Sequence, residues 1–237
     1  MTTHYYAPPE QIIGNTILLD EEEARHALQV LRAQVGTRMI VVDGVGGWYE
    51  AALVRSSKKQ AELHIISRRA HVGESGRELR VGLALLKNPD RFETFVEKAV
   101  ELGVTEIWAL QTLRTESQKF RPDRLERIMI AALKQCGRSV KPLLKLKKLP
   151  EALTEKEGNR FICHEKAILS NGGVPLMETN PNADTPMTIL IGPEGGFSDE
   201  EILEAERQGW QVATLGKRRL RAETAALVVA SLGIRLG

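Results

Sequence analysis

The C-terminal part of the chain alternates short apolar runs with glycine-bearing loops. Thr188–Ile191 is an apolar run that breaks into Gly-Pro-Glu-Gly-Gly, and Gln211–Leu215 is a second, mostly apolar run that breaks at Gly216. A short apolar run bounded by turn residues is typical of a buried strand in a parallel sheet. The pattern therefore predicts two buried strands, each of which ends in a loop.

Helix signals follow both loops. Ser198 and Glu201 form an S-x-x-E capping box, which predicts a helix that begins at about Asp199 and ends at Gly209. A further apolar stretch, from about Glu223, predicts another helix. Strands connected through helices run parallel, so both loops are expected at one carboxyl edge of a sheet. Open α/β sheets bind their ligands at that edge.

The middle of the chain repeats this alternation of strand and helix. Leu79–Leu86 and Val104–Leu110 are apolar runs, and between them Asn88 is an N-cap followed by proline at the first helical position. Arg160–Cys163 is a further short strand, and a helix with an apolar stripe is predicted from Pro122. The whole segment is therefore predicted to be α/β with a parallel sheet.

The first 70 or so residues are mostly β in pattern. Strands are predicted at Ile17–Leu19, Arg38–Val42, Trp48–Arg55 and Ala61–Ser67, and a short helix is expected from Asp20 to Leu31. His71–Glu78 is polar and contains glycine, as linkers do. We therefore expect two domains, a small β domain over residues 1–72 and an α/β domain over residues 73–237.

Composition restricts the class of protein. Apolar residues make up 42% of the chain and charged residues 27%, which is ordinary for a soluble protein. The N-terminus lacks a signal-peptide pattern and no apolar run approaches the ~18 residues of a membrane span, so a cytoplasmic protein is expected. Cys136 and Cys163 lie in no C-x-x-C pattern, so neither a disulfide framework nor a metal site is predicted.

Charge is unevenly distributed, although the formal net charge is only +2. Gln111–Lys148 holds eleven Lys or Arg against three Asp or Glu, whereas Glu151–Arg207 holds four against twelve. A basic block beside an acidic one indicates a face for a polyanion, and a solvated helical face is the structural alternative.

The loop that opens at Gly216 carries more cations than a turn needs. Lys217, Arg218, Arg219 and Arg221 lie within five positions. The first loop is rich in glycine, which removes side chains where a ligand can approach the backbone. Ordinary turns explain glycine and proline alone, but not their combination with a cationic second loop.

These two stretches, IGPEGGFSDEE and LGKRRLRAETAAL, resemble the S-adenosylmethionine (SAM) binding signature of the SPOUT methyltransferases. The chain is similar in particular to the bacterial 16S ribosomal RNA uridine-N3 methyltransferases, the RsmE family. KNPDRFETFVEKAVELGVTEIWAL is again similar to that family, and HALQVLRAQVGTRMIVVDGVGGWYEAALV resembles its PUA-like N-terminal domain. The resemblance implies a trefoil-knotted α/β domain, a PUA-like RNA-binding domain, SAM as methyl donor, 16S rRNA or the small ribosomal subunit as substrate, and a homodimer.

The resemblance also implies site residues. Cofactor-binding positions are expected at Leu190, Ile191, Gly192, Pro193, Glu194, Gly195, Gly196, Leu215, Gly216, Leu220, Arg221, Glu223 and Thr224, with His164 at the end of a neighbouring strand. RNA-binding positions are expected at Arg32, Arg114, Arg121, Gln135, Arg138 and Arg219. Lys134 and Cys136 depart from the Glu-Gln-Ser-Gly-Arg run that is usual in the family.

Arg221 is the predicted catalytic residue. Methyl transfer from a sulfonium needs an in-line approach and a competent nucleophile, and N3 of uracil must lose its proton before or during attack. A cation near O2 or O4 would stabilise the resulting anion, and Arg221 in the LRAET run is expected to do this or to bind the nucleotide's phosphate. Pairing of Arg221 with Glu223 or Glu194 is the structural alternative.

Other functions share parts of this pattern. A SPOUT enzyme acting on tRNA would keep the fold, and a non-catalytic RNA-binding ribosome-assembly factor would keep the basic surface. The N-terminal β domain with the ELGV and LRAET runs favours the ribosomal family, and intact glycine loops disfavour a loss of SAM binding. A nicotinamide dehydrogenase is disfavoured because no G-x-G-x-x-G motif opens the first strand-to-helix turn.

Overall fold

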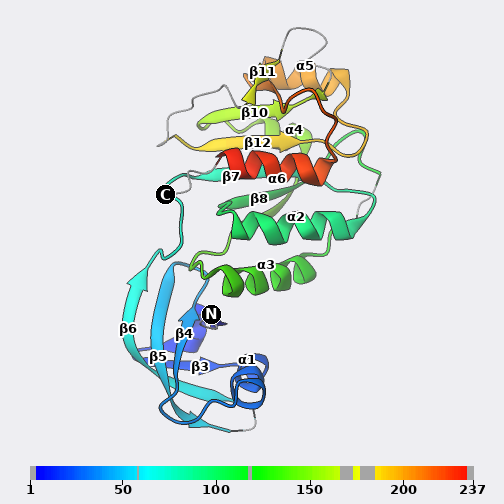
Figure 1. Cartoon of the computed structure of the whole chain (residues 1–237). Helices are drawn as coiled ribbons and strands as arrows, with labels where there is room; N and C mark the ends of the chain where they lie inside the picture. The colour runs from blue at the N-terminus through cyan, green and yellow to red at the C-terminus, as the bar shows by residue number, and fades with distance from the viewer. Residues whose placement is uncertain (1–3, 58, 117–118, 166–172, 177–184, 234–237) are drawn as a thin grey trace. The chain divides into compact units, whose positions relative to one another are not determined.

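The computed structural model describes residues 4–57, 59–116, 119–165, 173–176 and 185–233. They fall into two compact units (Figure 1). The N-terminal unit extends to Glu74 and includes Met129–Lys141, whereas the C-terminal unit comprises Ser75–Ile128 and the chain from Pro142 onward. The chain first passes from one unit to the other after Glu74, close to the predicted boundary at residue 72. The sequence pattern did not predict that Met129–Lys141 returns to the N-terminal unit.

The N-terminal unit is built on a six-stranded sheet with the order β1-β4-β5-β6-β3-β2. The strands are β1 (His4–Tyr6), β2 (Ile12–Ile13), β3 (Thr16–Leu19), β4 (Arg38–Val42), β5 (Gly47–Ser56) and β6 (Ala61–Ala70). β1 runs parallel to β4, and the other neighbours are antiparallel. Alternate side chains, including Ile17, Leu53 and Leu63, are buried in one apolar cluster, as the two-residue period of a strand requires.

The helical segment expected from Asp20 to Leu31 is confirmed, but only its first part is α-helical. α1 (Glu21–Arg25) begins where the Asp20 carboxylate accepts from the Glu23 N–H at 2.9 Å, and a π-helical turn, η2 (His26–Val30), follows it. The chain then turns at Arg32, whose φ of 52° lies in the left-handed region. That conformation cannot continue a right-handed helix, so the helical segment ends there.

Glu74 fastens the returning segment to the N-terminal unit. Its Oε2 accepts from Nε and Nη2 of Arg138 at 3.1 and 2.7 Å, and its Oε1 accepts from the N–H groups of Ser139 and Val140 at 3.1 and 2.9 Å. Arg138 is only 2% exposed. Since an unpaired buried charge is very costly, this carboxylate is what allows the guanidinium to lie inside the protein.

The C-terminal unit is built on a seven-stranded parallel sheet with the order β11-β13-β10-β12-β7-β8-β9. Its strands are β7 (Leu79–Ala84), β8 (Glu106–Gln111), β9 (Leu143–Lys148), β10 (Asn159–Cys163), β11 (Val174–Pro175), β12 (Met187–Ile191) and β13 (Gln211–Thr214). Every position of β7 and β12 is buried. This is expected for central parallel strands, which are covered on both faces.

The helices of this unit are α2 (Pro89–Glu101), α3 (Pro122–Cys136), α4 (Leu149–Leu153), α5 (Asp199–Arg207) and α6 (Ala222–Gly233). α3 contributes residues to both units. α2 begins at the predicted N-cap Asn88, whose side chain accepts from the Asp90 N–H at 2.9 Å. α5 begins with the complete capping box of Ser198 and Glu201. α2 and α6 pack together, and α6 also covers β7 and β12 (Figure 1).

The strand and helix predictions for the C-terminal unit are confirmed to within a few residues, but β9, β11 and α4 of this unit were not predicted, nor were β1 and β2 of the N-terminal unit. β9, with the sequence LLKLKK, is exposed or half-buried at all its positions and lies at the edge of the sheet. An edge strand needs no continuous apolar run. The lysines of β9 break the apolar pattern, so the sequence did not predict a strand there. Over the described ranges, no helix is long and apolar enough to cross a membrane.

Glu74→Ala is expected to destabilise the N-terminal unit by about 3–5 kcal/mol, because it removes the carboxylate that neutralises the buried Arg138. Urea unfolding followed by circular dichroism measures the change in midpoint. Glu62→Ala is the matched control, since Glu62 pairs with a mostly exposed Arg55 and such a pair contributes at most about 1 kcal/mol. Equal midpoints for the two variants would contradict the role given to Glu74.

Candidate functional site

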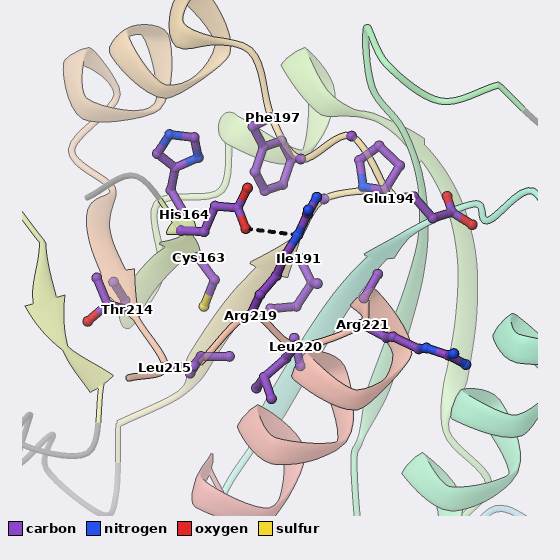
Figure 2. A pocket seen from close by; sticks show the side chains of 18 of the residues that line it. Cys163, His164, Ile191, Glu194, Phe197, Thr214, Leu215, Arg219, Leu220 and Arg221 are labelled. Carbon is purple, nitrogen blue, oxygen red and sulfur yellow. Dashed lines mark ion pairs between the residues drawn. The ribbon is translucent and has the colours of Figure 1, made fainter. Parts of the chain in front are cut away.

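Three parallel strands carry the candidate site at their carboxyl ends. β10 pairs with β12 on one side, where Cys163 lies opposite Ile191, and with β13 on the other, where Cys163 lies opposite Ala213. The loops that follow these strands therefore start at one level of the sheet, although they are separate in sequence. A cavity of about 400 Å³ opens between them (Figure 2).

The cavity wall contains most of the predicted cofactor-binding residues. From that prediction the wall includes His164, Ile191, Gly192, Pro193, Glu194, Gly195, Gly196, Leu215, Gly216, Leu220 and Arg221. The fold thus brings together the two glycine loops predicted to share a carboxyl edge, with the end of β10 between them.

The first loop is a tight turn that leads into α5. The Gly196 N–H donates to the Pro193 carbonyl at 2.8 Å, and Gly196 has a φ of 67°. A Cβ on Gly192 would come within 3.0 Å of the Gly196 carbonyl carbon. Glycine is therefore favoured at both positions, at Gly196 by backbone conformation and at Gly192 by close approach.

The backbone of this loop offers hydrogen-bond donors to a ligand. Among the residues that the structure describes, the N–H groups of Glu194, Gly195 and Phe197 donate to no protein acceptor. The Glu194 side chain is engaged elsewhere, because its Oε1 accepts from the Lys87 N–H at 3.1 Å. Of these three residues Phe197 is buried. Because a buried backbone N–H normally finds a partner, the open Phe197 N–H beside the cavity favours a ligand with acceptor atoms.

The second loop supplies apolar contact and cations. Leu215 and Leu220 are half-buried in the cavity wall, and Gly216 has a φ of 97°. Arg219 pairs with Glu165 at 3.4 Å, which links this loop to the end of β10. Both side chains are largely exposed, so this pair contributes little stability.

Arg221 is exposed and forms no ion pair with any residue in the described part of the chain. Figure 2 shows its side chain directed away from that of Arg219. The two carboxylates that the sequence offered as structural partners contact other groups instead, since Glu223 pairs through Oε1 with Arg91 at 3.7 Å and Glu194 accepts through Oε1 from a backbone N–H. The charge of Arg221 is therefore available to a ligand.

Three predicted cofactor-binding residues lie outside the cavity wall. Leu190 is completely buried in the apolar core, because adjacent side chains of a strand point to opposite faces and Ile191 faces the cavity. Glu223 pairs with Arg91, and its second oxygen is buried without a hydrogen-bond partner in the described chain. Thr224 is exposed on α6. A cofactor role for these three has no support from the geometry and stays a prediction.

Cys163, Arg91 and Phe197 line the cavity, although the sequence pattern did not single them out. Burial raises the pKa of the Cys163 thiol to about 12, so this thiol is neutral at physiological pH. A neutral thiol is a poor nucleophile, and Cys163 acts here as a small apolar side chain. Its place at the end of a strand, beside His164, was the signal available in the sequence.

The predicted RNA-binding residues have different environments. Exposed side chains occur at Arg32, Arg121, Gln135 and Arg219. Arg138 is buried in the N-terminal unit against a carboxylate, so the geometry favours a structural role for it.

Arg114 lies at the cavity but contacts its own chain. Its Nη1 donates to the carbonyl oxygens of Gly195 and Phe197 at 2.8 and 3.1 Å. The guanidinium is thus bound to the glycine loop in this structure, and an RNA contact by Arg114 stays a prediction.

Much of the predicted basic block is neutralised within the protein. Carboxylate partners are Glu93 for Arg124, Glu23 for Lys134, Glu74 for Arg138 and Glu106 for Lys145, while Lys147 Nζ lies 3.8 Å from the centre of the Trp108 ring. The block as a whole therefore does not form one free cationic face. Within the described residues, no group of three or more His, Cys, Asp or Glu side chains is arranged to hold a metal ion.

Family models match both parts of the chain. A model described as an RNA methyltransferase domain matches residues 74–233, and a model described as an RNA methyltransferase PUA domain matches residues 19–66. The first match covers more than half of the chain and contains all three loops of the cavity.

Curated relatives are similar over most of the chain. The chain is 36% identical over 189 residues to ribosomal RNA small subunit methyltransferase E of Mesomycoplasma hyopneumoniae, covering 75% of this chain and 78% of that protein. It is 32% identical over 229 residues to the protein of the same name from Synechocystis, covering 93% and 73%.

Solved structures share the fold. A probable rRNA methyltransferase from Porphyromonas gingivalis superposes with a TM-score of 0.87 at 29% identity, over 96% of this chain and 95% of that one. Ribosomal RNA small subunit methyltransferase E from Neisseria gonorrhoeae, solved bound to S-adenosyl methionine, superposes with a TM-score of 0.86 at 29% identity, over 98% and 96%. On the strength of the family model and these relatives, the chain belongs to the ribosomal RNA small subunit methyltransferase E family.

Proposed function

We propose that this protein transfers a methyl group from SAM to N3 of a uridine in 16S ribosomal RNA. Methylation of small-subunit RNA follows from the family, whereas the choice of uridine N3 rests on the resemblance of the two loop sequences. The observation that carries the proposal is the cavity at the ends of β10, β12 and β13, where open backbone N–H groups lie beside a cationic loop. A ribosomal RNA substrate implies a site of action in the cytoplasm.

The cavity suits the size and chemistry of SAM. Its volume of about 400 Å³ lies within the range of roughly 300–1,000 Å³ that is usual for small-molecule sites. Ile191, Leu215 and Leu220 present apolar surface for a purine ring, and the open N–H groups of the glycine loop present donors for its nitrogen acceptors. When bound, SAM supplies an already electrophilic methyl group, so the protein's task is to orient the reactants.

Arg221 is the side chain best placed to act on the target nucleotide. It lines the cavity, is exposed, and has no carboxylate partner among the described residues. A guanidinium beside O2 or O4 of uracil would stabilise the anion that remains when N3 loses its proton. The same charge would alternatively hold the phosphate of that nucleotide.

The RNA is proposed to contact both units through exposed cations. The PUA model match and the exposed Arg32 support a contact by the N-terminal unit. Exposed Arg121 and Arg219 support contacts by the C-terminal unit. Phosphate contacts of this kind contribute affinity and register more than base choice.

A homodimer is proposed from the surface of α6. Its sequence AETAALVVASLG is apolar nearly all round, and such a helix is normally buried on every side. Within the chain, Ala226 and Val229 are buried, Leu227 and Val228 are half-buried, and Leu232 is 39% exposed. A second copy would cover the remaining apolar surface. Light scattering would then give twice the single-chain mass of 26.3 kDa, and a single-chain mass would contradict the dimer.

The trefoil knot of the SPOUT family is part of the proposal. After β12 the chain passes through α5 to β13, on the far side of β10, and returns as α6 to pack on β7 and α2. This return past the site loops supports a threaded C-terminus, a feature that is rare among folds. A crystal structure traced through the whole chain would test it.

Methylation of 16S RNA from a strain that lacks this protein tests the main proposal. Incubation with the purified protein and SAM is expected to yield 3-methyluridine on nucleoside mass spectrometry, at one position in primer extension. A different methylated nucleoside would contradict the N3-uridine assignment. Calorimetry with SAM separates an enzyme from a pure RNA-binding factor, since the latter would show no binding heat.

Arg221→Ala is expected to reduce methylation at saturating SAM by a factor of about 10²–10³, as loss of an oxyanion-stabilising group does. SAM affinity, measured by calorimetry, is expected to fall much less. Lys217→Ala removes a cation of the same loop that lies outside the cavity wall, and it is expected to retain methylation. Normal turnover by Arg221→Ala would remove Arg221 from the mechanism.

RNA affinity is expected to weaken as salt rises, with a slope of log K against log salt of about −0.7 for each phosphate contact to single-stranded RNA. Filter binding from low to physiological salt measures the slope. Arg32→Gln and Arg121→Gln are each expected to make the slope shallower by one such step, while a flat response of the parent protein would contradict phosphate binding.

A further inference from the structure

The glycine loop of the cavity has a sequence that leaves much of its backbone conformationally free. Glycines at 192, 195 and 196 open space for a ligand, but glycine also leaves the backbone more conformational freedom than any other residue. Open N–H groups bind a ligand well only if their directions are fixed beforehand, since ordering them on binding costs affinity. The bond from the Gly196 N–H to the Pro193 carbonyl closes one turn within the loop, so contacts from outside the loop are needed to fix the remaining peptide planes.

The segment after β8 provides that restraint. β12, β7 and β8 are neighbours in the sheet, so the chain segments that follow them start side by side. Arg114 lies in a turn closed by the Thr115 N–H, which donates to the Thr112 carbonyl at 3.2 Å, and by the Thr112 N–H, which donates to Thr115 Oγ1 at 2.9 Å. We call residues 112–116 the strap.

Arg114, which lies in the strap, donates hydrogen bonds to two carbonyl groups of the loop. Its Nη1 donates to Gly195 O at 2.8 Å and to Phe197 O at 3.1 Å. The first carbonyl belongs to the peptide plane that precedes Gly196, and the second to the plane that follows Phe197. The plane between them carries the open Phe197 N–H, and two fixed neighbouring planes restrict its rotation. A charged donor makes such bonds stronger than neutral ones.

Four further contacts connect the strap, Lys87, the glycine loop and the start of α5. The Leu113 N–H donates to Glu201 Oε1 at 2.7 Å, while Glu201 Oε2 accepts from the Ser198 N–H at 2.8 Å at the start of α5. Lys87, which follows β7, pairs through Nζ with Glu116 at 2.9 Å and donates its N–H to Glu194. The loop is therefore held at Glu194 and at Ser198, and Arg114 binds it between these two positions.

We propose that Arg114 is a positioning residue that fixes the glycine loop in its ligand-binding conformation before SAM arrives. The inference rests on the proposed function in that SAM is taken as the ligand. It gives Arg114 a role distinct from RNA binding, because both of its described bonds go to the chain's own backbone.

The test compares Arg114→Gln with the parent protein in three measurements. SAM affinity by calorimetry is expected to fall about tenfold or more, as the loss of a charge-assisted contact would give. Methylation at saturating SAM is expected to change little, so KM for SAM rises while kcat is retained. Hydrogen exchange of a peptide covering residues 192–198 is expected to be faster in SAM-free protein. Arg114→Lys retains the charge without the planar fork and should lie between the two.

Arg127→Gln is the matched control. Arg127 is an exposed arginine on α3 whose Nε donates to the Asp123 carbonyl at 3.2 Å, so it also binds backbone but lies outside the cavity wall. It is expected to leave SAM affinity and loop exchange unchanged.

Each other outcome contradicts the proposal in a different way. Unchanged SAM affinity and exchange in Arg114→Gln would show that the loop holds itself. Weaker SAM binding with unchanged exchange would show that Arg114 contacts the ligand directly. Weaker RNA binding with normal SAM affinity would make it an RNA contact. If the parent protein itself fails to bind SAM, the proposed function is wrong, and faster loop exchange in Arg114→Gln would still be due to the strap.

Discussion

The parallel pairing of β10 with both β12 and β13 is the constraint on which the site depends. The pairing aligns Cys163 with Ile191 on one side and with Ala213 on the other, so three loops from separate parts of the sequence start at one level. A shift of one residue in either register would turn every side chain of that strand to the other face. Ile191 would then exchange its place at the cavity with Leu190, which is buried in the core.

The loops around the cavity must both let a ligand reach the backbone and keep that backbone ordered. Close approach of a ligand to backbone requires glycine, while affinity requires a backbone that is ordered in advance. The structure separates these tasks between segments. The glycine loop carries the open N–H groups. It is restrained by the Arg114 side chain, by the cap of α5, and by the Lys87 N–H, which donates to the loop's own Glu194 carboxylate. None of these restraints needs to touch the ligand.

Charge is divided in a similar way between structural and available groups. Four cations of the region rich in lysine and arginine have carboxylate partners, and a fifth lies over an indole ring. Arg138 is the extreme structural case, because it is buried and its partner Glu74 accepts four hydrogen bonds. Arg221 contrasts with these residues, since it lies at the cavity with no ion-pair partner in the described chain. Local composition alone therefore overstates the surface available to a polyanion.

The sequence by itself predicted most strands and helices of the C-terminal unit, the capping box of α5, and two of the three loops around the cavity. These features depend on residues close together in the chain, so local pattern and turn chemistry suffice to predict them. The side-chain partners were decided only by tertiary structure. Arg114 and Arg138 are both arginines in one basic segment. Arg114 nevertheless binds the backbone of the glycine loop, whereas Arg138 is buried against Glu74. Their partners are far away in sequence, and a local pattern carries no information about which distant group folding brings alongside.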